Sequence, residues 1–176
     1  VRTRATLRSH PVLLGGLFRI IGQEDVPLAT FSEPKRRHVL ADLQRWAGRW
    51  QIPLRFPRRF PTRSLDALRL YLALPEARRA AFRSAVFQAY WAEDRDITSR
   101  EVLASCGADA EAFAMMESES VKRALRTSTE AAAKAGIFGV PTFVIDGTDL
   151  YWGQDRLDLV EEQLGRASPI GTTAAT

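Results

Sequence analysis

Residues 136–157 have the sequence GIFGVPTFVIDGTDLYWGQDRL, and this stretch decides the fold. The segment that begins at Pro141 is β-branched and aromatic, which predicts a strand. Asp146-Gly147 is a strong signal for a two-residue hairpin turn, so the residues up to Trp152 are expected to form the returning strand. Asp155 then opens a predicted helix, because an aspartate there precedes apolar residues at helical spacing.

The residues before this stretch are predominantly helical in pattern. A long helix is expected from about Ser120 to Ala135, which is rich in Ala, Leu, Lys and Glu, and Gly136 is suited to end it. Ser64, Pro75, the Thr98-x-x-Glu101 capping box and Asp109 mark the starts of four other helices. A further helix begins at about Pro34, and its apolar residues share one face: Val39, Leu40, Leu43, Trp46, Ala47 and Trp50.

Three segments are not expected to be helical. Residues Val1 to Leu14 alternate loosely and are followed by Gly15-Gly16, which favours a strand entering a tight turn. Residues 52–61 are punctuated by prolines and are expected to be extended. The small and polar tail after Arg166 is expected to be disordered.

Composition narrows the class of protein. The 176 residues are 45% hydrophobic and 26% charged, as in one globular domain. The longest apolar stretches, such as Ile137–Val144, are far shorter than the roughly 20 residues of a membrane span, so we expect a cytoplasmic protein. The net charge is +4, but the basic runs at 35–37 and 55–59 accompany no nucleic-acid-binding motif, so no nucleic-acid partner is expected.

Few residues could hold a metal or react as a nucleophile. Cys106 is the only cysteine, which excludes an intrachain disulfide and a thiolate zinc cage within this sequence. We interpret it as a small apolar residue of the core rather than as a nucleophile. Two histidines, His10 and His38, are too few to indicate a metal site.

A helix, a strand that starts with proline, a hairpin and a last helix form the second half of a thioredoxin fold. The segments 136–144 and 152–157 resemble those of 2-hydroxychromene-2-carboxylate isomerases and the related kappa-class glutathione transferases. The resemblance extends to residues 11–18, 52–57, 96–98 and 129–132. The Trp-Gly-Gln-Asp-Arg segment is its most specific part, since Val-Pro-Thr is shared by all thioredoxin-like proteins. The expected class is therefore α/β, with a thioredoxin-like sheet and a large all-helical insertion.

The resemblance implies a site for glutathione as cofactor. Its expected glutathione-binding residues are Gln23, Val140, Pro141, Gln154 and Asp155, with Val140–Pro141 in cis and no metal. An exposed backbone edge at Val140 can pair with the cysteinyl backbone of this extended tripeptide. Asp155 can meet the γ-glutamyl ammonium, although it could equally be a plain helix cap. Gln23 stands where the family often has an asparagine.

The family's catalytic serine has no counterpart in this sequence. In the family it lies in a turn after the first strand, where its hydroxyl stabilises the glutathione thiolate, and that position would fall before Val1. We therefore expect a chain that lacks the family's first strand and helix and that is nearly inactive by itself. Expected divisions are 1–62 and 136–166 for the thioredoxin-like part, 63–135 for the helical insertion and 167–176 for the tail.

The implied function is glutathione-dependent isomerisation of 2-hydroxychromene-2-carboxylate in aromatic degradation, by a homodimer. A small aromatic carboxylate is the expected substrate. Arg19, Lys35 and Arg36 could meet its carboxylate, but a solvated surface role is the better interpretation of each. Two alternatives stay open: a DsbA-type thiol-disulfide oxidoreductase, and a non-catalytic, shortened relative that binds glutathione.

Overall fold

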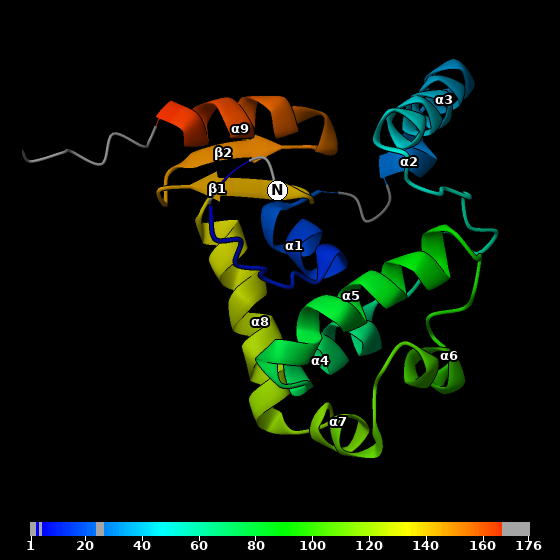
Figure 1. Cartoon of the computed structure of the whole chain (residues 1–176), viewed down its shortest axis with the longest axis vertical. Helices are drawn as coiled ribbons and strands as arrows, with labels where there is room; N and C mark the ends of the chain where they lie inside the picture. Colours follow the sequence, from blue (N-terminus) through cyan, green and yellow to red (C-terminus); the bar gives the residue numbers. More distant parts are fainter. Residues whose placement is uncertain (1–2, 4, 24–26, 167–176) are drawn as a thin grey trace, which may run out of the picture.

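The computed structural model describes residue 3, residues 5–23 and residues 27–166. These residues form nine α-helices, one short 3-10 helix and a two-stranded sheet (Figure 1). In chain order the elements are α1 (Leu14–Ile21), α2 (Pro27–Thr30), α3 (Glu33–Trp50), α4 (Leu65–Ala73), α5 (Glu76–Trp91), α6 (Arg100–Ser105), α7 (Ala110–Met115), α8 (Glu119–Lys134), β1 (Thr142–Ile145), β2 (Asp149–Trp152), η1 (Gln154–Arg156) and α9 (Leu157–Arg166). None of these helices has the combination of length and hydropathy that a membrane span requires.

The sheet is the hairpin that the sequence predicts. β1 and β2 pair antiparallel, with Thr142 opposite Trp152 at one end and Ile145 opposite Asp149 at the other. Asp146 and Gly147 both have positive φ, 51° and 80°, which is the backbone that an Asp-Gly hairpin turn needs. In Figure 1 the hairpin lies between α9 on one side and α1 with the end of α8 on the other. α9 contacts β1, and α1 packs against α8.

The main apolar core lies among the helices α4 to α7, below the sheet in Figure 1. Leu70 and Leu74 are almost completely buried there, together with Phe82 and Leu103. α4 is central because it contacts α5, α7 and α8. α8 also contacts α1 and is followed by β1 in the chain, so it links the helical core to the sheet.

Most predicted helices are present. α3 covers the segment expected from Pro34, and α8 covers the segment expected from Ser120, ending before Gly136 at φ +79°. The Asp109 carboxylate caps α7 by accepting from the Ala112 N–H at 2.8 Å. The apolar face of α3 is only partly covered, because none of its residues is fully buried.

The strand expected over Val1 to Leu14 is wrong for the part that the structure describes. α1 begins at Leu14, where a turn was expected, and residues 5–13 form no strand. Residues 1, 2 and 4 lie outside the described part. The backbone here bonds to side chains of α8: Ser128 Oγ donates to the Pro11 C=O at 2.7 Å, and the Leu13 N–H donates to Thr129 Oγ1 at 3.1 Å. Loose alternation does not make a strand without a backbone partner.

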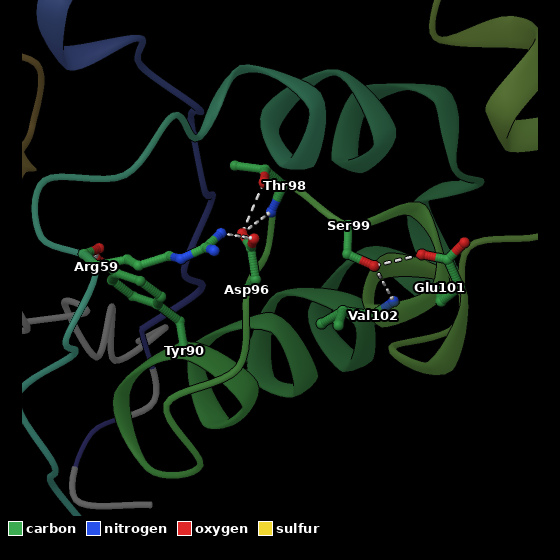
Figure 2. A network of polar contacts seen from close by, with 7 residues as sticks. All are labelled: Arg59, Tyr90, Asp96, Thr98, Ser99, Glu101 and Val102. Atoms are coloured by element: carbon green, nitrogen blue, oxygen red, sulfur yellow. Dashed lines mark hydrogen bonds and ion pairs between the residues drawn. The ribbon is translucent and has the colours of Figure 1, made fainter.

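Two predicted helix starts are shifted. Ser99, not Thr98, caps α6, because the Thr98 hydroxyl and N–H both donate to Asp96, at 2.7 and 3.0 Å (Figure 2). Ser99 accepts from the Val102 N–H and donates to Glu101. Asp155 lies within η1 and does not cap α9, which begins at Leu157. The predicted disorder after Arg166 falls outside the described residues.

Candidate functional site

A hollow of about 250 Å³ opens where the segment before β1 meets the end of β2 and η1. Its volume lies just below the usual range for small-molecule sites, roughly 300–1,000 Å³. The Val140–Pro141 bond at its edge is cis, as the family resemblance implies. Residues from α3, β2, η1 and the segment before β1 line it: Asp42, Val140, Pro141, Trp152, Gly153, Gln154, Asp155 and Arg156.

The backbone at Val140 is available to a ligand. On either side of it the carbonyls are engaged: Gly139 C=O accepts from Thr142 Oγ1 at 2.7 Å, and Pro141 C=O accepts from the Gly153 N–H at 3.0 Å. Within the described residues, neither the N–H nor the C=O of Val140 has a hydrogen-bonding partner. Val140 is 46% exposed as a residue, so it lies at the surface.

Local sequence signals place this edge. Gly136 ends α8 with positive φ, and the Ile137 N–H closes the helix end by donating to the Ala132 C=O at 3.0 Å. The Asp-Gly turn fixes the hairpin register, so Trp152 lies opposite Thr142, beside the start of β1. The chain then enters η1 immediately after β2, which brings the end of the sheet and a helix start together.

Asp155 folds back toward Gly153 at the start of η1. Gly153 has φ +109°, and a Cβ there would clash with Asp155 Oδ1, so a side chain at 153 would strain the backbone and displace the carboxylate. Asp155 Oδ2 is 3.5 Å from Arg156 Nη1, and both side chains are partly exposed. The hollow therefore has a carboxylate and a guanidinium together at its rim, which suits a ligand with both charges.

Asp42 is a lining residue that sequence reasoning missed. It comes from α3, which is tied to α9 by the ion pair between Arg49 and Asp158, at 3.4 Å. Nothing near Asp42 in the sequence distinguishes it from other acids on the solvent face of a helix. Only the placement of α3 beside η1 reveals it. With Asp155, it gives the hollow two carboxylates.

The structure gathers four of the five predicted binding residues: Val140, Pro141, Gln154 and Asp155 all line the hollow. Gln23 does not line it; its N–H donates to the Phe18 C=O at 2.9 Å just after α1, and its side chain is exposed. Arg19, Lys35 and Arg36 are also exposed and outside the lining. Their role in binding a substrate carboxylate has no support in the geometry of this hollow.

A second hollow, of about 380 Å³, lies beside Tyr90 and is a network of ion pairs. The Asp94 carboxylate accepts two hydrogen bonds from Arg58, one from the backbone N–H at 2.9 Å and one from the side-chain Nε at 2.6 Å. These hydrogen bonds hold the pKa of Asp94 below its ordinary value, and the backbone hydrogen bond has the larger effect. Hydrogen bonds from Thr98 lower the pKa of Asp96, which also pairs with Arg59 (Figure 2). The acids of this hollow are already paired with arginines. These ion pairs connect the segment between α3 and α4 to the loop after α5.

Cys106 belongs to the helical core. It is buried with Leu103 and Phe113, and its burial raises the pKa of its thiol. A thiol with a raised pKa stays protonated at neutral pH and is a poor nucleophile. The interpretation of Cys106 as an apolar core residue agrees with this position.

A helix followed by a cis-proline at the start of a strand, a hairpin and a last helix is the arrangement of a thioredoxin-like protein. Residues 1–165 match the DSBA-like thioredoxin domain. The chain belongs to this family, and the predicted fold class is confirmed.

Relatives with established names narrow the branch of the family. A 2-hydroxychromene-2-carboxylate isomerase of Pseudomonas putida is 36% identical over 137 residues, which are 75% of this chain and 66% of that protein. Human glutathione S-transferase kappa 1 is 32% identical over 180 residues, 90% of this chain and 77% of the transferase. A solved structure of 2-hydroxychromene-2-carboxylate isomerase superposes with a TM-score of 0.78 at 28% identity, covering 92% of this chain and 80% of that one. The predicted relationship to both kinds of enzyme is confirmed.

Proposed function

We propose that this chain binds glutathione at the hollow beside Val140 and acts in the glutathione-dependent isomerisation of 2-hydroxychromene-2-carboxylate. The observation that carries the proposal is the Val140 backbone, whose N–H and C=O have no partner within the described residues, although the carbonyls of Gly139 and Pro141 do. An extended peptide can form a strand-like pair of hydrogen bonds with such an edge. The names of the relatives supply the reaction and the cofactor.

Glutathione matches the donors, acceptors and charges of this hollow. Its cysteinyl residue has one N–H and one C=O, which can pair with the C=O and N–H of Val140. Its γ-glutamyl group carries an ammonium and a carboxylate, which complement Asp155 and Arg156 at the rim. Asp42 adds a second negative charge from α3 on the same hollow. The cofactor is thereby held by backbone and oriented by charge.

The residues of this chain bind and orient the cofactor. When bound, glutathione supplies a thiol that can add reversibly to a conjugated substrate, so that the bond to be isomerised becomes free to rotate. Pairing at Val140 fixes the cysteinyl backbone and so restricts where its sulfur can lie. Charge pairing at Asp155 fixes the other end. A defined sulfur position raises the effective concentration of the thiol at the substrate.

Calorimetric titration with reduced glutathione and with N-acetylglutathione tests the site. N-acetylation converts the ammonium into a neutral amide that carries an added acetyl group, so it should weaken binding about tenfold or more if the ammonium meets the carboxylates. Absorbance assays of hydroxychromene carboxylate with and without glutathione test the reaction. Equal affinity for the two ligands, or no binding, would contradict the proposed site. Binding without turnover would contradict the catalytic part of the proposal, and it would agree with the expectation that the chain is nearly inactive by itself and with the non-catalytic alternative.

The proposal extends to a homodimer in the cytoplasm, as part of aromatic degradation. Exposed apolar side chains on the hairpin, Val144 and Leu150, offer area that a second copy could cover. A cytoplasmic location supplies reduced glutathione and suits a sequence with a single cysteine. Sedimentation at micromolar concentration tests the assembly, and a strictly monomeric protein would contradict it.

A further inference from the structure

The indole of Trp152 lies against the backbone of Gly139, the residue just before Val140. A Cβ built on Gly139 would be 2.6 Å from Trp152 Nε1 and 3.2 Å from Cε2. A real Cβ essentially never lies within 3.0 Å of another heavy atom, so the indole Nε1 occupies the space that a side chain at 139 would need. Gly139 is buried, whereas Trp152 is 53% exposed, so the indole acts as a cover over this part of the backbone.

The strand pairing fixes Trp152 in this position. Its Cα is opposite Thr142 in the hairpin, and the Thr142 hydroxyl donates to the Gly139 C=O at 2.7 Å. The ring of Phe138, the residue before Gly139, lies 5.1 Å from the Trp152 ring, centroid to centroid. Gly139 is therefore held by two side chains of the hairpin, the Trp152 indole and the Thr142 hydroxyl, and the indole in turn packs against the Phe138 ring.

This arrangement contributes little to the core. Phe138 and Trp152 remain about half exposed, at 48% and 53%, and neither belongs to the buried cluster of α4 to α7. Exposed aromatic rings stabilise a fold less than buried ones, because they remove less apolar area from water. Their position next to an unpaired backbone edge points instead to a role in the geometry of that edge.

We propose that Trp152 is a positioning residue: it holds Gly139 so that the Val140 N–H and C=O face the ligand, and it requires glycine at 139 to do so. The inference rests on the proposed glutathione site. Trp152 also lines the hollow, but its effect on the cofactor acts through the backbone of residues 139–140. A side chain at 139 would push the indole and the backbone apart and turn the Val140 edge away.

A double-mutant cycle separates this role from general packing. We expect Gly139→Ala to lower glutathione affinity about tenfold in the wild-type background, and less than about twofold when Trp152→Ala has removed the indole. Trp152→Phe should retain most of the affinity that Trp152→Ala loses. Phe87→Ala is the matched control, since Phe87 is 58% exposed on α5, away from the hollow. Equal losses from Gly139→Ala in both backgrounds would overturn the inference.

Amide hydrogen exchange gives a readout that needs no ligand. The Gly153 N–H donates to the Pro141 C=O, so its exchange rate reports how firmly the residues around Val140 are held. Gly139→Ala should accelerate Gly153 exchange when Trp152 is present and should add nothing when Trp152 is alanine. If the wild-type chain fails to bind glutathione, the proposed function fails, while Gly153 exchange still decides whether Trp152 positions this backbone. An unchanged exchange rate of the Gly153 N–H in Gly139→Ala would overturn the inference that Trp152 is a positioning residue.

Discussion

The Leu13 N–H donates a hydrogen bond to Thr129 Oγ1 at 3.1 Å, and this contact ties the entry of α1 to the middle of α8. Thr129 is only 4% exposed, and its hydroxyl also donates to the Leu125 C=O at 2.9 Å. One buried hydroxyl thus satisfies a backbone N–H that has no helical or strand partner.

Thr129→Val should therefore destabilise the protein by about 1–3 kcal/mol, because the Leu13 N–H loses its acceptor while the side-chain volume is kept. Thr129→Ser keeps the hydroxyl and should cost less. Urea unfolding followed by circular dichroism measures both free energies of unfolding. A valine variant at least as stable as the serine variant would show that the bond contributes nothing.

The sequence predicts elements well where the signal is local. Gly136 and the Asp146-Gly147 turn specify their own backbone conformation, so the end of α8 and the hairpin follow from a few neighbouring residues. The strand prediction is wrong for residues 5–13 because a strand needs a partner strand, and the hydrogen bonds of this segment go to side chains of α8. Thr98 fails as a cap because Asp96 engages its hydroxyl, a choice between competing acceptors that spacing does not reveal.

The residues of the candidate site are likewise predictable from the sequence only where they lie close together in it. Val140, Pro141, Gln154 and Asp155 lie on one hairpin and its flanks, so a short motif contains them all. Asp42 reaches the hollow only because α3 lies beside η1 in the folded chain, which no pattern within α3 encodes.

Asp155→Asn separates the two interpretations of this aspartate. Asparagine is as good a helix-capping residue as aspartate, so stability should change little. It lacks the charge that would meet the γ-glutamyl ammonium, so glutathione affinity should fall about tenfold or more. Calorimetric titration measures the affinity, and Asp149→Asn makes the same charge change at the far end of β2 as a control. Full affinity for glutathione in Asp155→Asn would show that the Asp155 charge does not meet the γ-glutamyl ammonium.

Stability should fall in acid through the aspartates of the second hollow. Hydrogen bonds from Arg58 and from Thr98 lower the pKa values of Asp94 and Asp96 in the folded chain. A carboxyl whose folded pKa is lowered contributes stability that is fully present above its unfolded value, about 4, and is lost as the pH falls through the folded value. Asp94→Asn and Arg58→Ala should both flatten the fall in unfolding free energy below about pH 4. An unchanged pH dependence in both variants would exclude this network as its source.

Gly153→Ala should damage the hollow more than an equally strained glycine elsewhere. Gly153 has φ +109°, and a Cβ there would lie 2.4 Å from Asp155 Oδ1, so alanine both strains the backbone and displaces the carboxylate. Gly147 has φ +80° in the hairpin turn with no atom within 4 Å of its built Cβ, so Gly147→Ala adds strain alone. Both variants should lower the melting temperature, since each places a side chain at positive φ, at a cost of about 1–3 kcal/mol. Only Gly153→Ala should also weaken glutathione binding, and it should add nothing further to Asp155→Asn, because the same carboxylate is lost in both. Equal affinity of the two alanine variants for glutathione would mean that the position of Asp155 does not matter to the ligand.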